Sequence, residues 1–377
     1  MRRGRWAYYF LGWLAAIALL ADLLANDRPI VAGYADGVYF PAISSNDRVQ
    51  VEAAGTPDWA IWPPIPFRAS TTDLSQPGYR PPFASPPGGE PAHLLGTDRL
   101  GRDTLAGLIN GTRVAVCVGV GSLLISLIVG LPLGAVAGFF GNGGLQLRLA
   151  NLLACGLGAT LGLLYALASL LPLVGFGPLF CLMVVLSVGI GVSLCYLVLW
   201  PLRKHFGWWQ QPIGLPIDWF VLLLLELAVS IPGLVLLIAV LSFVDRPPLY
   251  LLVLVIGLLG WTPIARFLRA ELLRIRELPY IAAARMGGVG ELRLLIRHAL
   301  PNALGPVAVV ASFMVGTSIL AEAMLSFLGI GVPSDQVTWG SLLQQSRLRP
   351  DAWWLAVFPG LLLTMTVLAC NSIRQSR

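Results

Sequence analysis

Residues 261–302 read WTPIARFLRAELLRIRELPYIAAARMGGVGELRLLIRHALPN and form a basic island in an otherwise apolar chain. The island holds seven arginines against three glutamates, and long uncharged runs flank it on both sides. An excess of arginine next to apolar spans is typical of the cytoplasmic loops of membrane proteins. The sequence therefore predicts that this stretch lies on the inner side of a membrane and orients the spans around it.

The composition agrees with a membrane protein. Of the 377 residues, 56% are hydrophobic and only 12% are charged, and the mean hydropathy is +0.77. Soluble domains carry about 25% charged residues. The net charge of +6 comes from arginines beside apolar runs, with Lys204 as the single lysine. Membrane topology explains this charge better than nucleic-acid binding does. The expected fold class is all-α, a polytopic bundle of transmembrane helices.

Eight spans are expected, because a bilayer core of about 30 Å requires roughly 20 apolar residues per helix. They cover about 7–24, 114–139, 150–171, 179–200, 219–243, 249–267, 305–330 and a last run that ends near 371. Arginines precede the first span and follow the last one, which predicts that the N- and C-termini are both cytoplasmic.

The expected domains are a first transmembrane helix, an extracytoplasmic loop with an approach helix, and a main transmembrane domain. Their ranges are 1–24, 25–112 and 113–377, with an inserted helical hairpin at 150–200 and a cytoplasmic loop at 266–302. The extracytoplasmic loop is expected to contain a short β-hairpin around residues 33–40. The approach helix is expected to be amphipathic and to be capped by Thr97 or Asp98.

Glycines spaced by four residues predict close helix packing. Gly130, Gly134 and Gly138 share one helical face, and Gly158 and Gly162 repeat the pattern in the hairpin. In lipid, small residues at this spacing let two backbones approach.

No motif for catalysis, metal binding or nucleotide binding is evident. The chain has no GxxxxGK[ST], HExxH or GxSxG run, its histidines stand apart, and its five cysteines lie in apolar runs without metal-ligand spacing. The sequence leaves intramembrane charge as the remaining signal: Glu226 and Glu322 are candidates for a translocation pathway or, equally, for helix-to-helix hydrogen bonds. Pro232 is the third pathway candidate and is expected to kink the helix that carries Glu226, which would suit a moving part or merely a bent one.

Within the island, YIAAARMGG at 280–288 predicts a short helix that Gly287 and Gly288 end, and Leu300-Pro301 is expected to start the next membrane helix. We call residues 280–291 the knob. A rigid knob between two spans would transmit force from a soluble partner. The alternative is a solvated loop whose arginines only set topology.

Several stretches of the chain resemble the dipeptide/oligopeptide-type permease subunits of binding-protein-dependent ABC importers, in the subgroup with an enlarged first external loop. The resemblance follows the family's order over roughly two thirds of the chain. The matching stretches include LGTDRLGRDTLAGLINGTR at 95–113, SIPGLVLLIAV at 230–240, GWTPIARFLRAELL at 260–273, ILAEAMLSFLGIGVP at 319–333 and FPGLLLTMTVLA at 358–369.

This resemblance implies a permease in the inner membrane of a prokaryote. Its implied partners are a second permease, two cytoplasmic ATPases that bind the ATP, and an extracytoplasmic solute-binding protein; no cofactor is expected in this chain. The family's coupling loop matches Ala282, Ala283, Ala284, Gly288, Leu300 and Pro301, and Tyr280 and Arg285 lie within the same stretch. The loop's usual glutamate is Ala282 here, so docking to the ATPase is expected to rest on the shape of the loop and on Arg285. The hairpin is an addition to the family's pattern.

Several alternatives stay open. The same fold could import a nickel chelate, a glycan or a modified peptide in place of a peptide. The missing glutamate and the added hairpin would also suit a membrane scaffold that does not transport. A channel or a proton-coupled carrier would need more paired intramembrane charges than Glu226 and Glu322 supply.

Overall fold

The computed structural model describes residues 5–34, 37–42, 57–72, 78–84, 91–170, 178–202, 212–244, 247–332 and 336–375. The chain divides into two compact units, which are described separately. Unit 1 comprises Met1–Ala135 and Leu225–Arg377, and unit 2 comprises Val136–Leu224.

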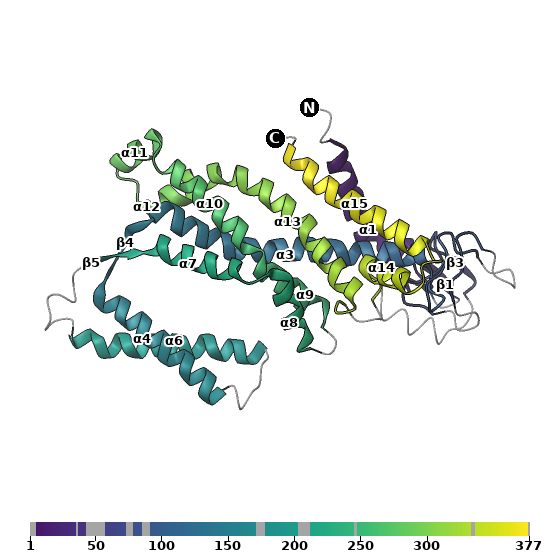
Figure 1. Ribbon diagram of the computed structural model, residues 1–377, viewed down its shortest axis with the longest axis horizontal. Helices are drawn as coiled ribbons and strands as arrows, with labels where there is room; N and C mark the ends of the chain where they lie inside the picture. The colour runs from purple at the N-terminus through teal and green to yellow at the C-terminus, as the bar shows by residue number, and fades with distance from the viewer. Residues whose placement is uncertain are drawn as a thin grey trace. The chain divides into compact units, whose positions relative to one another are not determined.

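Helices dominate the chain, which confirms the predicted all-α membrane bundle (Figure 1). Among the described residues, five helices are long and apolar enough to cross a bilayer: Trp6–Leu24, Thr104–Phe140, Leu249–Ile275, Glu291–Leu328 and Trp354–Ser372. A sixth span arises if the bent pair Ile217–Ser230 and Gly233–Ser242 crosses as one. These six correspond to the expected spans outside the hairpin. The count of eight stays a prediction.

Those spans are built from α1 (Arg5–Leu24), α3 (Thr104–Phe140), the pair α7 (Ile217–Ser230) and α8 (Gly233–Ser242), the pair α9 (Leu249–Leu259) and α10 (Trp261–Ile275), α13 (Leu300–Leu328) and α15 (Trp354–Gln375). A short helix, α14 (Trp339–Leu348), follows α13. Trp339 is buried and donates from Nε1 to the Leu108 carbonyl at 3.0 Å, which fixes α14 to α3.

The predicted kink at Pro232 is confirmed. The chain bends by 74° between α7 and α8, and Pro232 is the residue immediately before α8. Proline has no N–H to donate into the preceding turn, and its ring clashes with the carbonyl four residues earlier. The break follows from these two effects.

The predicted approach helix capped by Thr97 or Asp98 is wrong. One continuous helix of 37 residues, α3, begins at Thr104. Asp98 instead accepts hydrogen bonds from the N–H groups of Leu100 and Arg102, which closes a local turn. Gly101 follows with a φ of 75°, in the left-handed region that a helix does not use. Asp103 then accepts from Ala106 N–H at 2.7 Å and satisfies the first turn of the helix.

The start expected at Leu300-Pro301 agrees with the first residues of α13, although α12 (Glu291–Leu294) and the π-helical segment η3 (Leu295–Ala299) lead into it without a break. Pro301 would clash with a carbonyl one α-helical turn earlier. The wider π turn, in which Leu300 N–H reaches the Leu295 carbonyl, lies directly before it. The helix therefore accommodates its proline without a break.

The glycine seam on α3 is confirmed at two positions in unit 1. A Cβ at Gly130 would lie 2.8 Å from the Trp261 carbonyl oxygen, and one at Gly134 would lie 2.6 Å from that of Ala265. The seam therefore packs α3 against the backbone of α10, on the face where Ile264 and Leu268 are fully buried.

Unit 2 contains the predicted helical hairpin. Its helices are α4 (Leu149–Tyr165), extended by η1 (Ala166–Leu170), and α6 (Pro178–Leu202), and most of the expected turn between them lies outside the described residues. A Cβ at Gly158 or Gly162 would overlap the backbone of α6, so the predicted close packing is confirmed. Two strands that the sequence did not indicate, β4 (Asn142–Arg148) and β5 (Pro212–Pro216), pair antiparallel at the base of the hairpin.

The β-hairpin expected around residues 33–40 is confirmed. Strands β1 (Val31–Tyr34) and β2 (Gly37–Tyr39) pair antiparallel. A third strand, β3 (Trp59–Ile61), joins the other edge of β1, so the sheet order is β2-β1-β3. In unit 1 this sheet lies at the end that also holds α14, opposite the end that carries α11 (Figure 1).

Candidate functional site

The knob is a short helix held between two long ones. Helix α11 (Pro279–Met286) follows α10 and precedes α12, and it starts with Pro279 at its first turn, where a missing N–H costs no hydrogen bond. Gly288 has a φ of 83°, which turns the chain sharply after the helix. Ile281 is fully buried and anchors the knob. The predicted short helix and its glycine stop are therefore present.

An ion pair between Arg285 and Glu291 joins α11 to the start of α12 within the knob. Arg285 donates from Nε and Nη2 to the two carboxylate oxygens of Glu291, at 2.6 and 3.1 Å. The hydrogen bonds that Arg285 donates to Glu291 raise the pKa of Arg285 above its usual value. Both side chains are near half exposed, so the pair contributes at most about 1 kcal/mol. Its main effect is to fix the start of α12 against α11. Arg285 is thus engaged within the chain, although the sequence suggested it as a handle for a partner.

The outer face of the knob is apolar and small. Ala282 and Ala283 are exposed, Met286 is 84% exposed, and Leu292 on α12 is 64% exposed. Sequence reasoning missed Met286 and Leu292. The spacing of Leu292 and Ile296 by four residues was the available signal, since both positions lie on one helical face and both are exposed.

Tyr280 links the knob to the following span. Asn302 donates to the Tyr280 hydroxyl at 3.4 Å and to the His298 carbonyl at 2.7 Å. Leu300 and Pro301 lie in the same region, at the start of α13. A force on α11 therefore has both a covalent and a hydrogen-bonded route into α13.

The two intramembrane glutamates occupy different environments. Glu322 on α13 is only 1% exposed, and it accepts a hydrogen bond from the Ser326 hydroxyl at 2.7 Å. Glu226 on α7 is exposed. Neither glutamate lines the groove between α8, α9, α10 and α13. The hydrogen bond between Ser326 and Glu322 joins two residues of α13, so the helix-to-helix alternative and the pathway role of both glutamates stay predictions.

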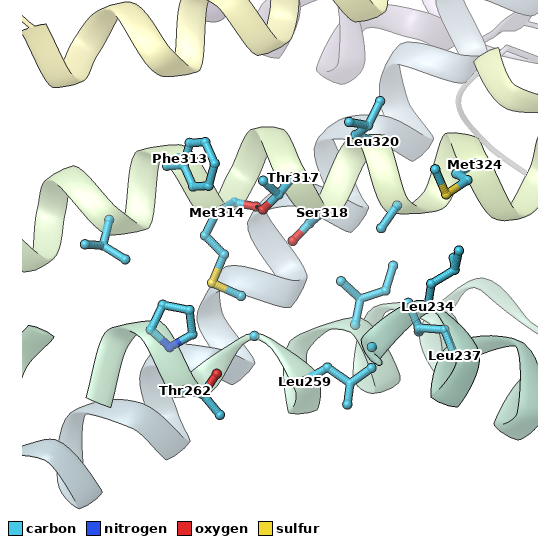
Figure 2. A pocket seen from close by; sticks show the side chains of 16 residues that line it. Leu234, Leu237, Leu259, Thr262, Phe313, Met314, Thr317, Ser318, Leu320 and Met324 are labelled. Atoms are coloured by element: carbon cyan, nitrogen blue, oxygen red, sulfur yellow. Dashed lines mark hydrogen bonds between the residues drawn. The ribbon is translucent and has the colours of Figure 1, made fainter. Parts of the chain in front are cut away.

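A groove of about 420 Å³ lies between α8, α9, α10 and α13 in unit 1 (Figure 2). The wall of the groove that α8 forms begins at Gly233, the residue after Pro232, where the chain bends. Apolar side chains dominate the lining, and its side-chain hydroxyls come from Thr262, Thr317 and Ser318. Figure 2 shows Phe313, Met314 and Met324 along α13. Across the groove lie Leu259 of α9 and Thr262 of α10, and beside them Leu234 and Leu237 of α8.

The absence of a side chain at Gly260 shapes this groove. A Cβ there would lie 1.9 Å from the methyl carbon of Met314. Met314 thus packs over the junction between α9 and α10, and any side chain at position 260 would displace its methyl end.

The LGTDRLGRD stretch forms a polar cluster that fixes the start of α3. Asp98 pairs with Arg102 at 2.8 Å and accepts from Gln345 of α14 at 3.2 Å. Trp354 of α15 donates to the Thr97 carbonyl at 3.1 Å. The stretch thus ties α3, α14 and α15 together, which is a structural role.

Comparisons with known proteins point to membrane transport. Residues 205–375 match the family described as binding-protein-dependent transport system inner membrane component. The inner membrane ABC transporter permease protein YejE of Escherichia coli is 26% identical over 398 aligned residues, which cover 100% of this chain and 93% of that protein.

Two further relatives extend the comparison. A putative peptide transport system permease protein of Brucella suis is 48% identical over 110 residues, or 29% of this chain and 37% of that protein. The peptidoglycan transport system permease protein YejE of Agrobacterium fabrum is 24% identical over 416 aligned residues, covering 100% and 89% of the two chains.

Proposed function

We propose that this chain, which carries the inner membrane domain of binding-protein-dependent transport systems, is a permease subunit of an ATP-driven ABC importer for peptides or peptide-like solutes. The chain forms one half of the translocation pathway and a second permease forms the other half. A solute-binding protein delivers the cargo from outside, and two cytoplasmic ATPases bind and hydrolyse the ATP. Arginines near both termini support a cytoplasmic location for both, with the chain in the inner membrane of a prokaryote.

Peptide cargo is supported by the Brucella suis relative, which is named as a peptide transport permease, and by the character of the groove. The groove offers hydroxyls and apolar surface and has no charged residue in its lining. Such a surface accepts varied side chains, because no fixed charge selects among them. One relative is named for peptidoglycan transport, so a peptidoglycan-derived peptide is the second candidate cargo.

Coupling to the ATPases is proposed to occur through the knob. The observation that carries this proposal is an exposed apolar helix, α11, anchored by Ile281 and joined on both sides to helices that cross the membrane. An apolar surface at the end of a membrane bundle is suited to fit a groove in a soluble partner. Movement of that partner would displace α10 and α13, whose side chains line the groove.

The test is co-purification of the permease with its ATPase subunits. Met286→Glu places a charge at the exposed tip of the knob and should reduce the amount of bound ATPase. Leu348→Glu is the matched control, since Leu348 is also an exposed apolar residue but lies on α14 at the opposite end of unit 1. Equal recovery of the ATPases with both variants would refute coupling through the knob.

Deleting residues 280–291 is the stronger form of the same test. The deletion should abolish co-purification, provided that the shortened chain still inserts into the membrane. Insertion is checked by extraction of the membrane fraction with alkaline carbonate, which leaves integral proteins behind.

A further inference from the structure

The small sheet of unit 1 exposes its apolar face. Because strand partners opposite one another share a face, Val31, Gly33, Val38, Trp59 and Ile61 all lie on the same side of the sheet. Of these, Val38 is 56%, Trp59 is 50% and Ile61 is 55% exposed. None of the five described positions is charged. Antiparallel sheets commonly pack their apolar face against something, so this exposed face is a candidate contact surface.

The opposite face of the sheet is the one that packs inward. Ala32 is fully buried, and Tyr34 and Tyr39 stack edge to face with ring centroids 5.8 Å apart. On the exposed face, the Trp59 ring lies across Gly33, where a Cβ would overlap the indole nitrogen at 2.2 Å. The glycine therefore lets an indole lie flat on the outside of the sheet, and the exposed orientation of Trp59 is built into the strand pairing.

The sheet is tied to the end of a membrane span. Ile65 donates its N–H to the Leu24 carbonyl at 3.1 Å, and Asn26 donates to the Ile65 carbonyl at 3.2 Å. Helix α1 has 20 residues, which gives a length of about 30 Å and matches the bilayer core. Leu24 therefore lies at the membrane surface. Ile61 is four residues from Ile65, so it lies at most about 14 Å from that anchor even in a fully extended chain.

Helix α1 also exposes apolar side chains near the end at which it is bonded to this segment. Leu19, five residues before Leu24, is 82% exposed, and in a membrane span such a side chain faces lipid. Tryptophan is enriched at the level of the lipid headgroups, because its ring is apolar while its N–H can still reach water. Trp62, next to Ile61, is also more than half exposed. The exposed face thus lies close to the end of a membrane span and contains a tryptophan among apolar residues, which is the composition of an interfacial anchor.

We propose that the face formed by Val38, Trp59 and Ile61 inserts into the headgroup layer of the membrane beside α1. The occupant of this face is the lipid surface. This contact would hold the first extracytoplasmic segment against the membrane surface, beside the transmembrane helices.

The test measures the depth of a spin label in nanodiscs of phosphatidylethanolamine and phosphatidylglycerol. The label is attached to the full chain, freed of its own cysteines, at Ile61→Cys. Leu19→Cys is the lipid-exposed reference and Ala92→Cys, in an exposed loop, is the aqueous reference. Collisions with oxygen, which concentrates in lipid, are compared with collisions with a water-soluble nickel chelate.

The expected result is a ratio of oxygen to nickel collisions at position 61 that exceeds the ratio at position 92 and approaches that at position 19. A ratio equal to that at position 92 overturns the proposal. A label that is water-exposed alone and becomes immobilised when the solute-binding protein is added also overturns it, because the occupant is then a protein. Val38→Cys repeats the measurement on the same face if the first variant does not fold.

Discussion

Replacing Gly134 by alanine should force α3 away from α10. A Cβ at this position would lie 2.6 Å from the Ala265 carbonyl oxygen and 2.9 Å from its Cα, both of which are backbone atoms that cannot rotate away. Non-bonded carbon contacts are relaxed at about 3.5 Å, so the two helices must separate by roughly 0.6–0.9 Å. Overpacking of this kind typically costs about 1–3 kcal/mol.

The control for this variant is Gly12→Ala in α1. No atom lies within 4 Å of a Cβ at Gly12, and Gly12 is also inside a membrane helix of unit 1. Alanine improves helix propensity by about 1 kcal/mol at either site, so the difference between the two variants isolates the steric cost. Equilibrium unfolding by SDS titration in mixed micelles, followed by tryptophan fluorescence, gives both free energies of unfolding. If the two variants are equally stable, the seam at Gly134 does not pack as described.

Three further changes test other parts of the chain. Glu291→Ala should weaken ATPase binding while changing the free energy of unfolding by less than about 1 kcal/mol, since the pair with Arg285 is exposed. A double-mutant cycle with Arg285→Ala measures the coupling energy between the two side chains, and additive effects would show that the pair contributes nothing to binding. Gly260→Val should obstruct the groove and lower the rate of peptide uptake in proteoliposomes without loss of the ATPases, and unchanged uptake would exclude the groove from the pathway. Trp354→Phe should lower the free energy of unfolding by about 1–2 kcal/mol through loss of the bond to the Thr97 carbonyl, and an unchanged value would contradict that contact.

Much of this architecture is predictable from the sequence because lipid imposes simple rules. Apolar runs of sufficient length must be helical, so six spans follow from hydropathy alone. The glycine spacing at 130 and 134 predicts close packing, and Pro232 predicts a kink, since both depend on local geometry. The short helix at 280–288 follows from its alanines and its glycine stop. These features need no knowledge of which segments meet.

The errors occurred where a distant contact or a local irregularity decides the outcome. Asp98 has the right chemistry for a helix cap, but its carboxylate is engaged by Arg102 and by Gln345 on α14, a residue far along the chain. The groove is equally invisible in the sequence, because ordinary apolar residues from four helices line it. The pairing of Arg285 with Glu291 is likewise visible only in the fold, and a contact of Arg285 with a partner stays a prediction.

The π turn at Leu295–Ala299 changes how the helix before and after it must be interpreted. A π turn contains one residue more than the α-helical turn it replaces, and each residue of an α-helix advances by about 100°. Side chains of α12 and α13 are therefore out of phase by about that angle, and a single helical wheel drawn in phase with α13 assigns the side chains of α12 to the wrong face. Removing one residue from this turn would rotate Leu292 and the knob around the axis of α13. The direction in which the knob points is thus determined by one extra residue, whereas its shape is determined by α11.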